Sequence, residues 1–124
     1  MTAGVVVAVL VAGAFGATLR WLVSRTLAGR RFPVAVLLVN TVGSAIGGVI
    51  LALSAAAAIG DDWRLILLTG FCGGLTTFST LSVETVQLVL DGRARVAVLN
   101  VTLNVAIGLV AASVAFALTS ALVA

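Results

Sequence analysis

The sequence predicts an all-α membrane protein with four transmembrane helices, of which the third is broken at mid-membrane. Of the 124 residues, 62% are hydrophobic and only 9% are charged, and the mean hydropathy is +1.32. Soluble domains carry about 25% charged residues, so this composition is typical of integral membrane proteins. Four apolar stretches, each long enough to cross a bilayer, alternate with short charged connections. We therefore expect a single four-span domain over residues 1–124, with approximate spans 3–25, 33–59, 64–90 and 95–123.

The first stretch runs from Ala3 to about Leu22 and carries one charge, Arg20, near its end. No charged residue precedes Arg20, so the stretch lacks the basic start of a signal peptide and is interpreted as a retained span. The neighbouring Trp21 is typical of the aromatic belt at a membrane surface. We expect Arg20 to have a structural role there, holding helix ends in place.

The second and fourth stretches contain no charge but carry amide side chains. Asn40 lies early in the second, and its two amide hydrogens suit an anion. Asn100 and Asn104 lie four residues apart in the fourth, so they share one helix face. Polar residues within spans are rare and often functional. These asparagines are therefore candidate contacts for an ion, with hydrogen bonding between helices as the alternative.

The third stretch contains the most informative motif, Gly70-Phe-Cys-Gly-Gly-Leu-Thr-Thr-Phe-Ser-Thr-Leu81. Its adjacent glycines, Gly73 and Gly74, form helices poorly, and four hydroxyl residues follow them. In lipid, a helix breaks only where the freed backbone groups find partners in protein, water or an ion. The motif therefore predicts a break, with Gly74 in a structural role and with unwound carbonyls that can coordinate a cation. Phe78 adds a ring whose positive edge can face an anion, with plain packing as the alternative.

The composition argues against several classes of function. The chain has no His and a single Cys, which excludes a disulfide framework within the chain, a Cys/His zinc site and a Ser-His-Asp triad. All seven basic residues are Arg, and they flank apolar spans instead of forming the basic patches of a nucleic-acid binder. No nucleophile paired with a base and no cofactor motif is evident. We expect neither an enzyme nor a nucleic-acid-binding protein.

The arginines are divided unevenly between the two sides of the membrane. The first and third connections, with the adjoining end of the first span, hold six of them: Arg20, Arg25, Arg30, Arg31, Arg93 and Arg95. The other side holds only Arg64. Because basic loops stay cytoplasmic, both termini are predicted to face outside, in a multi-pass protein of the cell membrane. Four short spans do not easily enclose an ion pathway, which argues for at least a dimer.

These segments resemble the Fluc (CrcB) family of fluoride channels. The resemblance covers all four spans in order, and it rests on Gly13-Ala-Phe-Gly-Ala-Thr-Leu-Arg20-Trp21, Asn40-Thr-Val-Gly43-Ser and Gly70-Phe-Cys-Gly-Gly-Leu-Thr-Thr-Phe-Ser-Thr80. It implies a dual-topology-type dimer of two antiparallel subunits, through which fluoride leaves the cytoplasm passively, lowering fluoride toxicity. It implies a structural Na⁺, not transported, at the dimer centre, on the backbone carbonyls of Gly73 and Thr76. It also implies a pore path along Asn40, Phe78, Ser79 and Thr80, to which we add Asn104 as a polar residue of the fourth span.

Two positions depart from the family pattern. Members usually carry a second Phe three residues after the first, where this chain has Leu81, so one ring contact is lost. Members also usually carry Tyr and Ser in the fourth span where this chain has Asn100 and Asn104. An antiparallel homodimer requires a chain that inserts both ways, whereas the arginine bias favours one orientation. We therefore predict one half of a heterodimer with an oppositely biased homologous partner, with a homodimer as the alternative.

Two other functions fit four spans less well. A small multidrug-type transporter relies on a carboxylate embedded in its first span, but here that span has no acid. Glu84 is the only acid near the interior of any span. A non-conducting structural partner subunit is the second alternative, and the polar residues within the spans argue against it.

Overall fold

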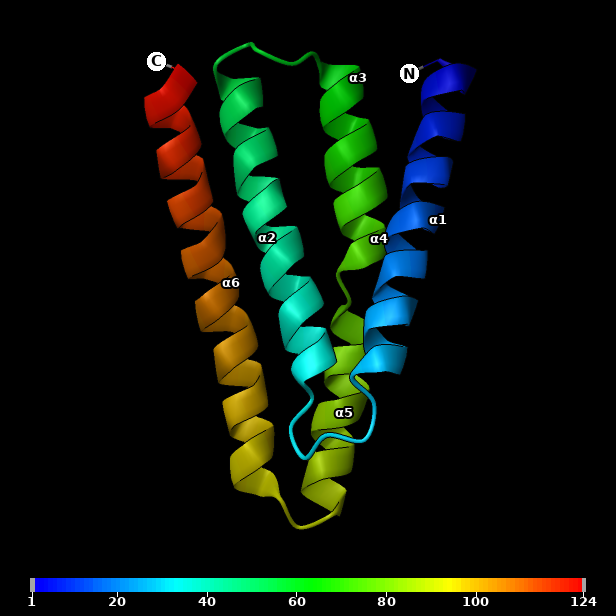
Figure 1. Cartoon of the computed structure of the whole chain (residues 1–124), viewed down its shortest axis with the longest axis vertical. Helices are drawn as coiled ribbons and strands as arrows, with labels where there is room; N and C mark the ends of the chain where they lie inside the picture. Colours follow the sequence, from blue (N-terminus) through cyan, green and yellow to red (C-terminus); the bar gives the residue numbers. More distant parts are fainter. Residues whose placement is uncertain (1, 124) are drawn as a thin grey trace.

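The structure is a computed structural model that describes residues 2–123, and every regular element within that range is a helix (Figure 1). Three spans are single helices: α1 (Ala3–Thr26), α2 (Val34–Ala55) and α6 (Ala94–Val123). The third span consists of α3 (Asp61–Arg64), the π-helical segment η1 (Leu65–Cys72), α4 (Gly73–Leu75) and α5 (Phe78–Leu90). Four helical stretches are long and apolar enough to cross a membrane. The prediction of an all-α protein with four such helices is confirmed.

The helices lie side by side, and their connections are short (Figure 1). The α1–α2 and α5–α6 connections lie at one end, while both ends of the described chain and the α2–α3 connection lie at the other. Gly29 and Gly92, in the two connections at the first end, have φ of 81° and 73°. A backbone of that kind favours glycine, which has no Cβ to clash.

The helices pair unevenly. Helix α2 lies along α6, α1 packs against η1 and α4, and α5 packs against α6. Glycines permit the close approaches: a Cβ on Gly16 of α1 would lie 2.8 Å from the backbone nitrogen of Leu75 in α4. A Cβ on Gly48 of α2 would likewise clash with the carbonyl oxygen of Ala112 in α6. Small residues of this kind let helix backbones approach closely inside membranes.

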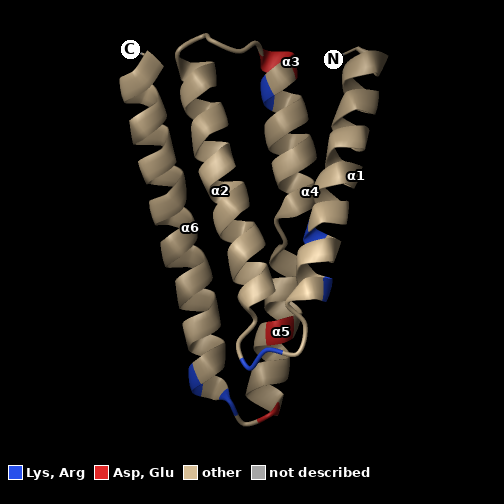
Figure 2. Ribbon diagram, viewed as in Figure 1, with Lys and Arg blue, Asp and Glu red and all other residues tan. Residues whose placement is uncertain are grey.

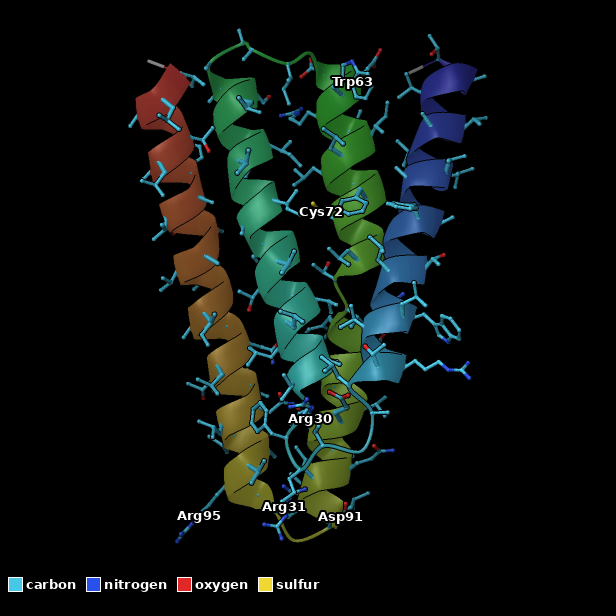
Figure 3. All side chains as sticks on the ribbon, viewed as in Figure 1. Arg30, Arg31, Trp63, Cys72, Asp91 and Arg95 are labelled. Carbon is cyan, nitrogen blue, oxygen red and sulfur yellow. The ribbon has the colours of Figure 1, made fainter. Side chains whose placement is uncertain are left out.

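Charged residues gather at the two ends of the helices (Figure 2). Figure 3 labels Arg30, Arg31, Asp91 and Arg95 near one end and Trp63 near the other. Among residues 2–123, the second end carries one ion pair, in which Arg64 Nη2 lies 3.5 Å from Asp61 Oδ1. The apolar bodies of the helices between these ends leave many large hydrophobic side chains exposed, as expected for surfaces that face lipid.

Candidate functional site

The third span leaves the helical conformation at Thr76 and Thr77. Helix α4 ends at Leu75, and the next two residues are extended, with φ and ψ of −82° and 160° at Thr76 and −151° and 122° at Thr77. Helix α5 then begins at Phe78. The hydroxyl of Thr77 accepts a hydrogen bond from the backbone N–H of Thr80 at 3.1 Å, which is the usual way in which threonine caps a helix start.

The extended residues redirect two backbone N–H groups. In a continuous helix the N–H of Thr77 would donate to the carbonyl of Gly73. Here it donates to Asn40 Oδ1 at 2.8 Å. The N–H of Thr80 would likewise donate to the carbonyl of Thr76, but it donates to the Thr77 hydroxyl. The carbonyl oxygens of Gly73 and Thr76 therefore lack their helical donors.

A chain of asparagine side chains holds the extended segment in place. Asn40 Nδ2 donates to the carbonyl of Thr77 at 3.2 Å and to Asn104 Oδ1 at 2.9 Å. Asn104 Nδ2 donates to the carbonyl oxygen of Asn100 at 2.9 Å and to its Oδ1 at 3.2 Å. Asn100 Nδ2 in turn donates to Thr85 Oγ1 at 3.4 Å. The structure thus brings Asn40 and Asn104 into direct contact and links α2, α5 and α6 through neutral groups.

Hydroxyl groups continue this network into α5. Thr77 Oγ1 donates to Thr80 Oγ1 at 3.0 Å and lies 3.3 Å from Ser79 Oγ. Thr77 is therefore the residue that joins the predicted hydroxyls, Ser79 and Thr80, to the predicted asparagines. It is buried. The sequence predictions assigned no site role to Thr77, because it is one of four neighbouring hydroxyl residues and is followed three residues later by Thr80, where a capping box has Glu or Gln.

Phe78 and the asparagine pair line one groove. The groove has a volume of about 280 Å³, and its lining comprises Asn40, Ser44, Thr76, Thr77, Phe78, Leu81 and Asn104. Phe78 is 81% exposed, whereas Thr77 and Asn104 are buried. Leu81, the residue found in place of an expected second Phe, borders the same groove. Ser79 and Thr80 do not line it.

Thr80 instead lines a separate cavity of about 290 Å³ at the arginine-bearing end. Glu84 and three arginines, Arg30, Arg31 and Arg93, share that lining. Arg93 Nη2 donates to the carbonyl of Arg31 at 2.6 Å and so ties the two connections at this end together. Within residues 2–123, Glu84 Oε2 is buried and has no hydrogen-bond partner. Thr77, which lines the groove, is thus hydrogen-bonded to Thr80, which lines this cavity.

Arg20 and Gly74 meet next to the extended segment. Arg20 Nε donates to the carbonyl of Gly74 at 3.0 Å, from α1 to α4. A Cβ on Gly74 would clash with the carbonyl oxygen of Gly13 in α1. These two residues therefore fix the last turn before the extended segment against α1.

The carbonyl oxygens of Gly73 and Thr76 lie beside a cavity that holds no cluster of acidic, His or Cys side chains among the described residues. Among the described residues, no group of three or more His, Cys, Asp or Glu side chains could hold a metal ion. Gly73 and Thr76 line a third cavity, of about 370 Å³, together with Cys72, which Figure 3 labels, and with glycines of α2. Hard cations prefer oxygen ligands such as carbonyls.

Residues 7–116 match the family model described as CrcB-like protein, Camphor Resistance (CrcB). The chain is 47% identical over 116 residues to the Fluoride-specific ion channel FluC 1 of Yersinia pseudotuberculosis serotype I (strain IP32953), with 91% of each chain covered. It is 46% identical over 116 residues to the Fluoride-specific ion channel FluC 2 of Rhodococcus jostii (strain RHA1), covering 93% of this chain and 98% of the relative. It is 42% identical over 114 residues to the Fluoride-specific ion channel FluC of Serratia proteamaculans (strain 568), covering 90% of each.

Proposed function

This chain belongs to the CrcB family, and from that membership we propose that it is a fluoride-selective channel that lets fluoride leave the cytoplasm passively. The observation that carries the proposal is the similarity, over nine-tenths of the chain, to proteins named fluoride-specific ion channels. It is a multi-pass membrane protein with four apolar helices of spanning length, and a channel of this kind is not an enzyme. Export of fluoride would lower its toxicity to the cell.

The proposed path follows the groove and then the hydroxyls of α5. It passes Asn40, Phe78 and Asn104, continues past Ser79 and Thr80, and opens into the cavity at the arginine-bearing end. Neutral donors and a ring edge can replace the hydration shell of a small anion without retaining the ion. In this structure Asn40 donates from Nδ2 to two protein oxygens. A fluoride ion bound there would replace one of those oxygens as the acceptor.

The extended segment is proposed to be a helix break inside the bilayer. Thr76 and Thr77 lie near the middle of the apolar stretch Asp61–Leu90, which supports this placement. A structural Na⁺, not transported, would bind the carbonyls of Gly73 and Thr76, which lack their helical donors. Exchanging Na⁺ for N-methylglucamine during purification should lower the temperature at which the assembled protein loses its fold. An unchanged melting temperature in Na⁺-free buffer would argue against the site.

The channel is proposed to assemble from two antiparallel, homologous subunits. One observation supports a partner: the groove lies open at the surface beside the exposed Phe78. The proposed Na⁺ site requires a partner too, since each chain would supply only two carbonyls to it. The division of the arginines, six against one, supports a heterodimer over a homodimer. In a heterodimer, the pore bordered by Leu81 of this chain would lack one of the two ring contacts, and it would differ from the other pore in that respect.

The test is fluoride efflux from liposomes, measured with a fluoride electrode and with chloride efflux as the control. Efflux of fluoride alone from vesicles holding only this chain would establish a homodimeric channel and show that the heterodimer is wrong. If the folded chain is silent alone, co-reconstitution with an oppositely biased homologous chain should restore efflux. Absence of fluoride efflux in both preparations would overturn the proposed function.

A further inference from the structure

All three asparagines of the chain take part in one continuous series of hydrogen bonds. Two of them, Asn40 and Asn104, border the groove. The third, Asn100, is fully buried, at 0% exposure, and borders none of the three cavities described above. Its contacts are Asn104 on one side and Thr85 of α5 on the other. Asn100 therefore influences the groove only through the side chains that it orients.

The series has a fixed direction, which its two ends impose. At one end, the Thr85 hydroxyl donates its only hydrogen to the carbonyl of Leu81 at 2.7 Å. The oxygen of that hydroxyl can then only accept, so Asn100 turns Nδ2 toward it. Asn100 Oδ1 consequently faces Asn104 and accepts from its Nδ2, which also donates to the Asn100 backbone carbonyl one turn earlier in α6.

The orientation of the Asn104 amide in turn determines that of Asn40, which borders the groove. Because Asn104 directs Nδ2 to Asn100, its Oδ1 faces Asn40. Asn40 therefore donates to that oxygen from its own Nδ2. Asn40 Oδ1 is then left to accept from the backbone N–H of Thr77, which closes the series at its other end. Reversing any one amide would set two nitrogens or two oxygens against each other. In a buried site an unmade hydrogen bond of this kind is costly.

We propose that Asn100, anchored by Thr85, is a positioning residue that sets the direction of the Asn40 amide and thereby the anion preference of the groove. The inference rests on the proposed function, since it takes fluoride as the solute. An amide that offers its nitrogen hydrogens attracts an anion, whereas an amide that offers its carbonyl oxygen attracts a cation. The sequence of the fourth span, Asn100 followed by Asn104 four residues later, supplies this direction.

The first test changes Thr85, which lies at the end of the series farthest from the groove. Thr85→Val keeps the shape of the side chain and removes the hydroxyl, so Asn100 Nδ2 loses the acceptor that fixes the orientation of its amide. We expect the ratio of fluoride to potassium permeability in liposomes to fall by roughly tenfold, the effect of losing one hydrogen bond of the buried Asn100 amide. Thr85→Ser restores the hydroxyl and should return the ratio to the parental value. Thr102→Val, an equivalent change at an exposed position of α6, should leave it unaltered.

Selectivity separates positioning from simple stability. A merely structural role would reduce the amount of folded protein and leave the permeability ratio of the folded fraction unchanged. A double substitution, Thr85→Val with Asn100→Leu, should lower the ratio no further than the stronger single change, since both interrupt one series. If Thr85→Val conducts with the parental ratio, the inference is wrong and the channel function stands.

A second readout does not depend on conduction. Selective ¹⁵N labelling of asparagine gives three side-chain amide signals, one for each residue of the series. Thr85→Val should shift the Asn40 signal, although two asparagines separate the two residues, and Thr102→Val should not. If the parent is silent even with a partner, the proposed function fails, and the Asn40 signal alone decides whether the series orients it. An unmoved Asn40 signal would overturn the inference in either case.

Discussion

At the scale of single residues, Phe78 is unusual because it is 81% exposed while its neighbour Thr77 is buried. It begins helix α5 at the end of the extended segment, where the chain direction is held by the Thr77 cap. An exposed ring contributes little to the packing of its own subunit. Its place beside the groove fits the role of a ring edge offered to an anion.

Replacing this ring gives a direct test of that role. Phe78→Ile keeps an apolar side chain and removes the quadrupole, so fluoride flux through the active assembly should fall by roughly tenfold. Phe116→Ile, at a 41% exposed position of α6, is the matched control and should retain the parental flux. Both rates are measured by electrode in the same liposomes. A parental rate for Phe78→Ile would show that this ring is not in the path.

The sequence identifies the members of this site better than their contacts. Asn40 and Asn104 could be selected because amides inside apolar stretches are rare, and the structure joins them by a 2.9 Å hydrogen bond. Thr77 was not selected, because nothing in the sequence distinguishes it from the three hydroxyl residues beside it. Its importance arises from the extended backbone, which directs its N–H and its carbonyl to Asn40. Such pairings depend on the register between α2 and the third span, which apolar stretches do not encode.

At the scale of helices, α1 holds the third span through backbone contact. A Cβ on Gly16 would lie 2.8 Å from the Leu75 nitrogen and would clash with the Phe71 carbonyl, while Arg20 binds the Gly74 carbonyl one turn further along α1. Backbone atoms cannot move aside as side chains can, so this contact tolerates no added methyl group. Helix α1 thereby fixes where the extended segment lies.

Gly16→Ala should therefore destabilise the protein, by about 1–3 kcal/mol, the range found for overpacked sites. Gly4→Ala is the matched control in the same helix, because the nearest atom to its added Cβ is Thr2 Oγ1 at 3.9 Å. That change should leave stability unchanged or raise it, since alanine favours helices over glycine. The comparison requires the melting temperature by circular dichroism in detergent. Melting of Gly16→Ala at the parental temperature would contradict the proposed packing.

The sequence predicts the existence of the helices more reliably than their detailed form. The uncharged stretch of the second span continues to Ile59, but α2 ends at Ala55, where Ala57 takes a φ of 52° and the N–H of Ala58 bonds to the carbonyl of Leu53. A run of alanines contains no residue that would mark such an end. The π-helical hydrogen bonding of η1, shown by the Gly73 N–H on the Leu68 carbonyl, is likewise invisible in the apolar sequence.

At the scale of the whole molecule, the arginines of the first and third connections lie at one end and define its electrostatic polarity (Figure 2). The opposite end carries Asp61, Asp62 and Arg64. Basic segments are retained in the cytoplasm during insertion, so the chain should insert with both termini outside. A reporter enzyme that works only outside the cytoplasm should be active when fused to either terminus, and a reporter that works only in the cytoplasm should be inactive there. Equal activity of the two reporters at the same terminus would show that the arginine bias does not set the orientation.

Rebalancing the arginines should then change what the chain does alone. Arg25→Gln and Arg95→Gln together with Ala56→Arg and Ala58→Arg alter only exposed positions outside the described cavities and change the count from six against one to four against three. If orientation alone prevents self-assembly, this variant should insert both ways and give fluoride efflux without a partner. If the variant inserts both ways but gives no efflux, the chain requires a partner for residues of the pore and not for orientation.

Helix α6 is long for the membrane that it crosses. Its 30 residues, rising about 1.5 Å each, extend for about 45 Å, whereas a bilayer core measures about 30 Å. Such an excess is accommodated by tilt or by local thickening of the lipid. A tilt of α6 would move Asn104, which the proposed ion path contacts, and Asn100 with it. We therefore expect fluoride efflux to differ between vesicles of short-chain and long-chain phosphatidylcholine.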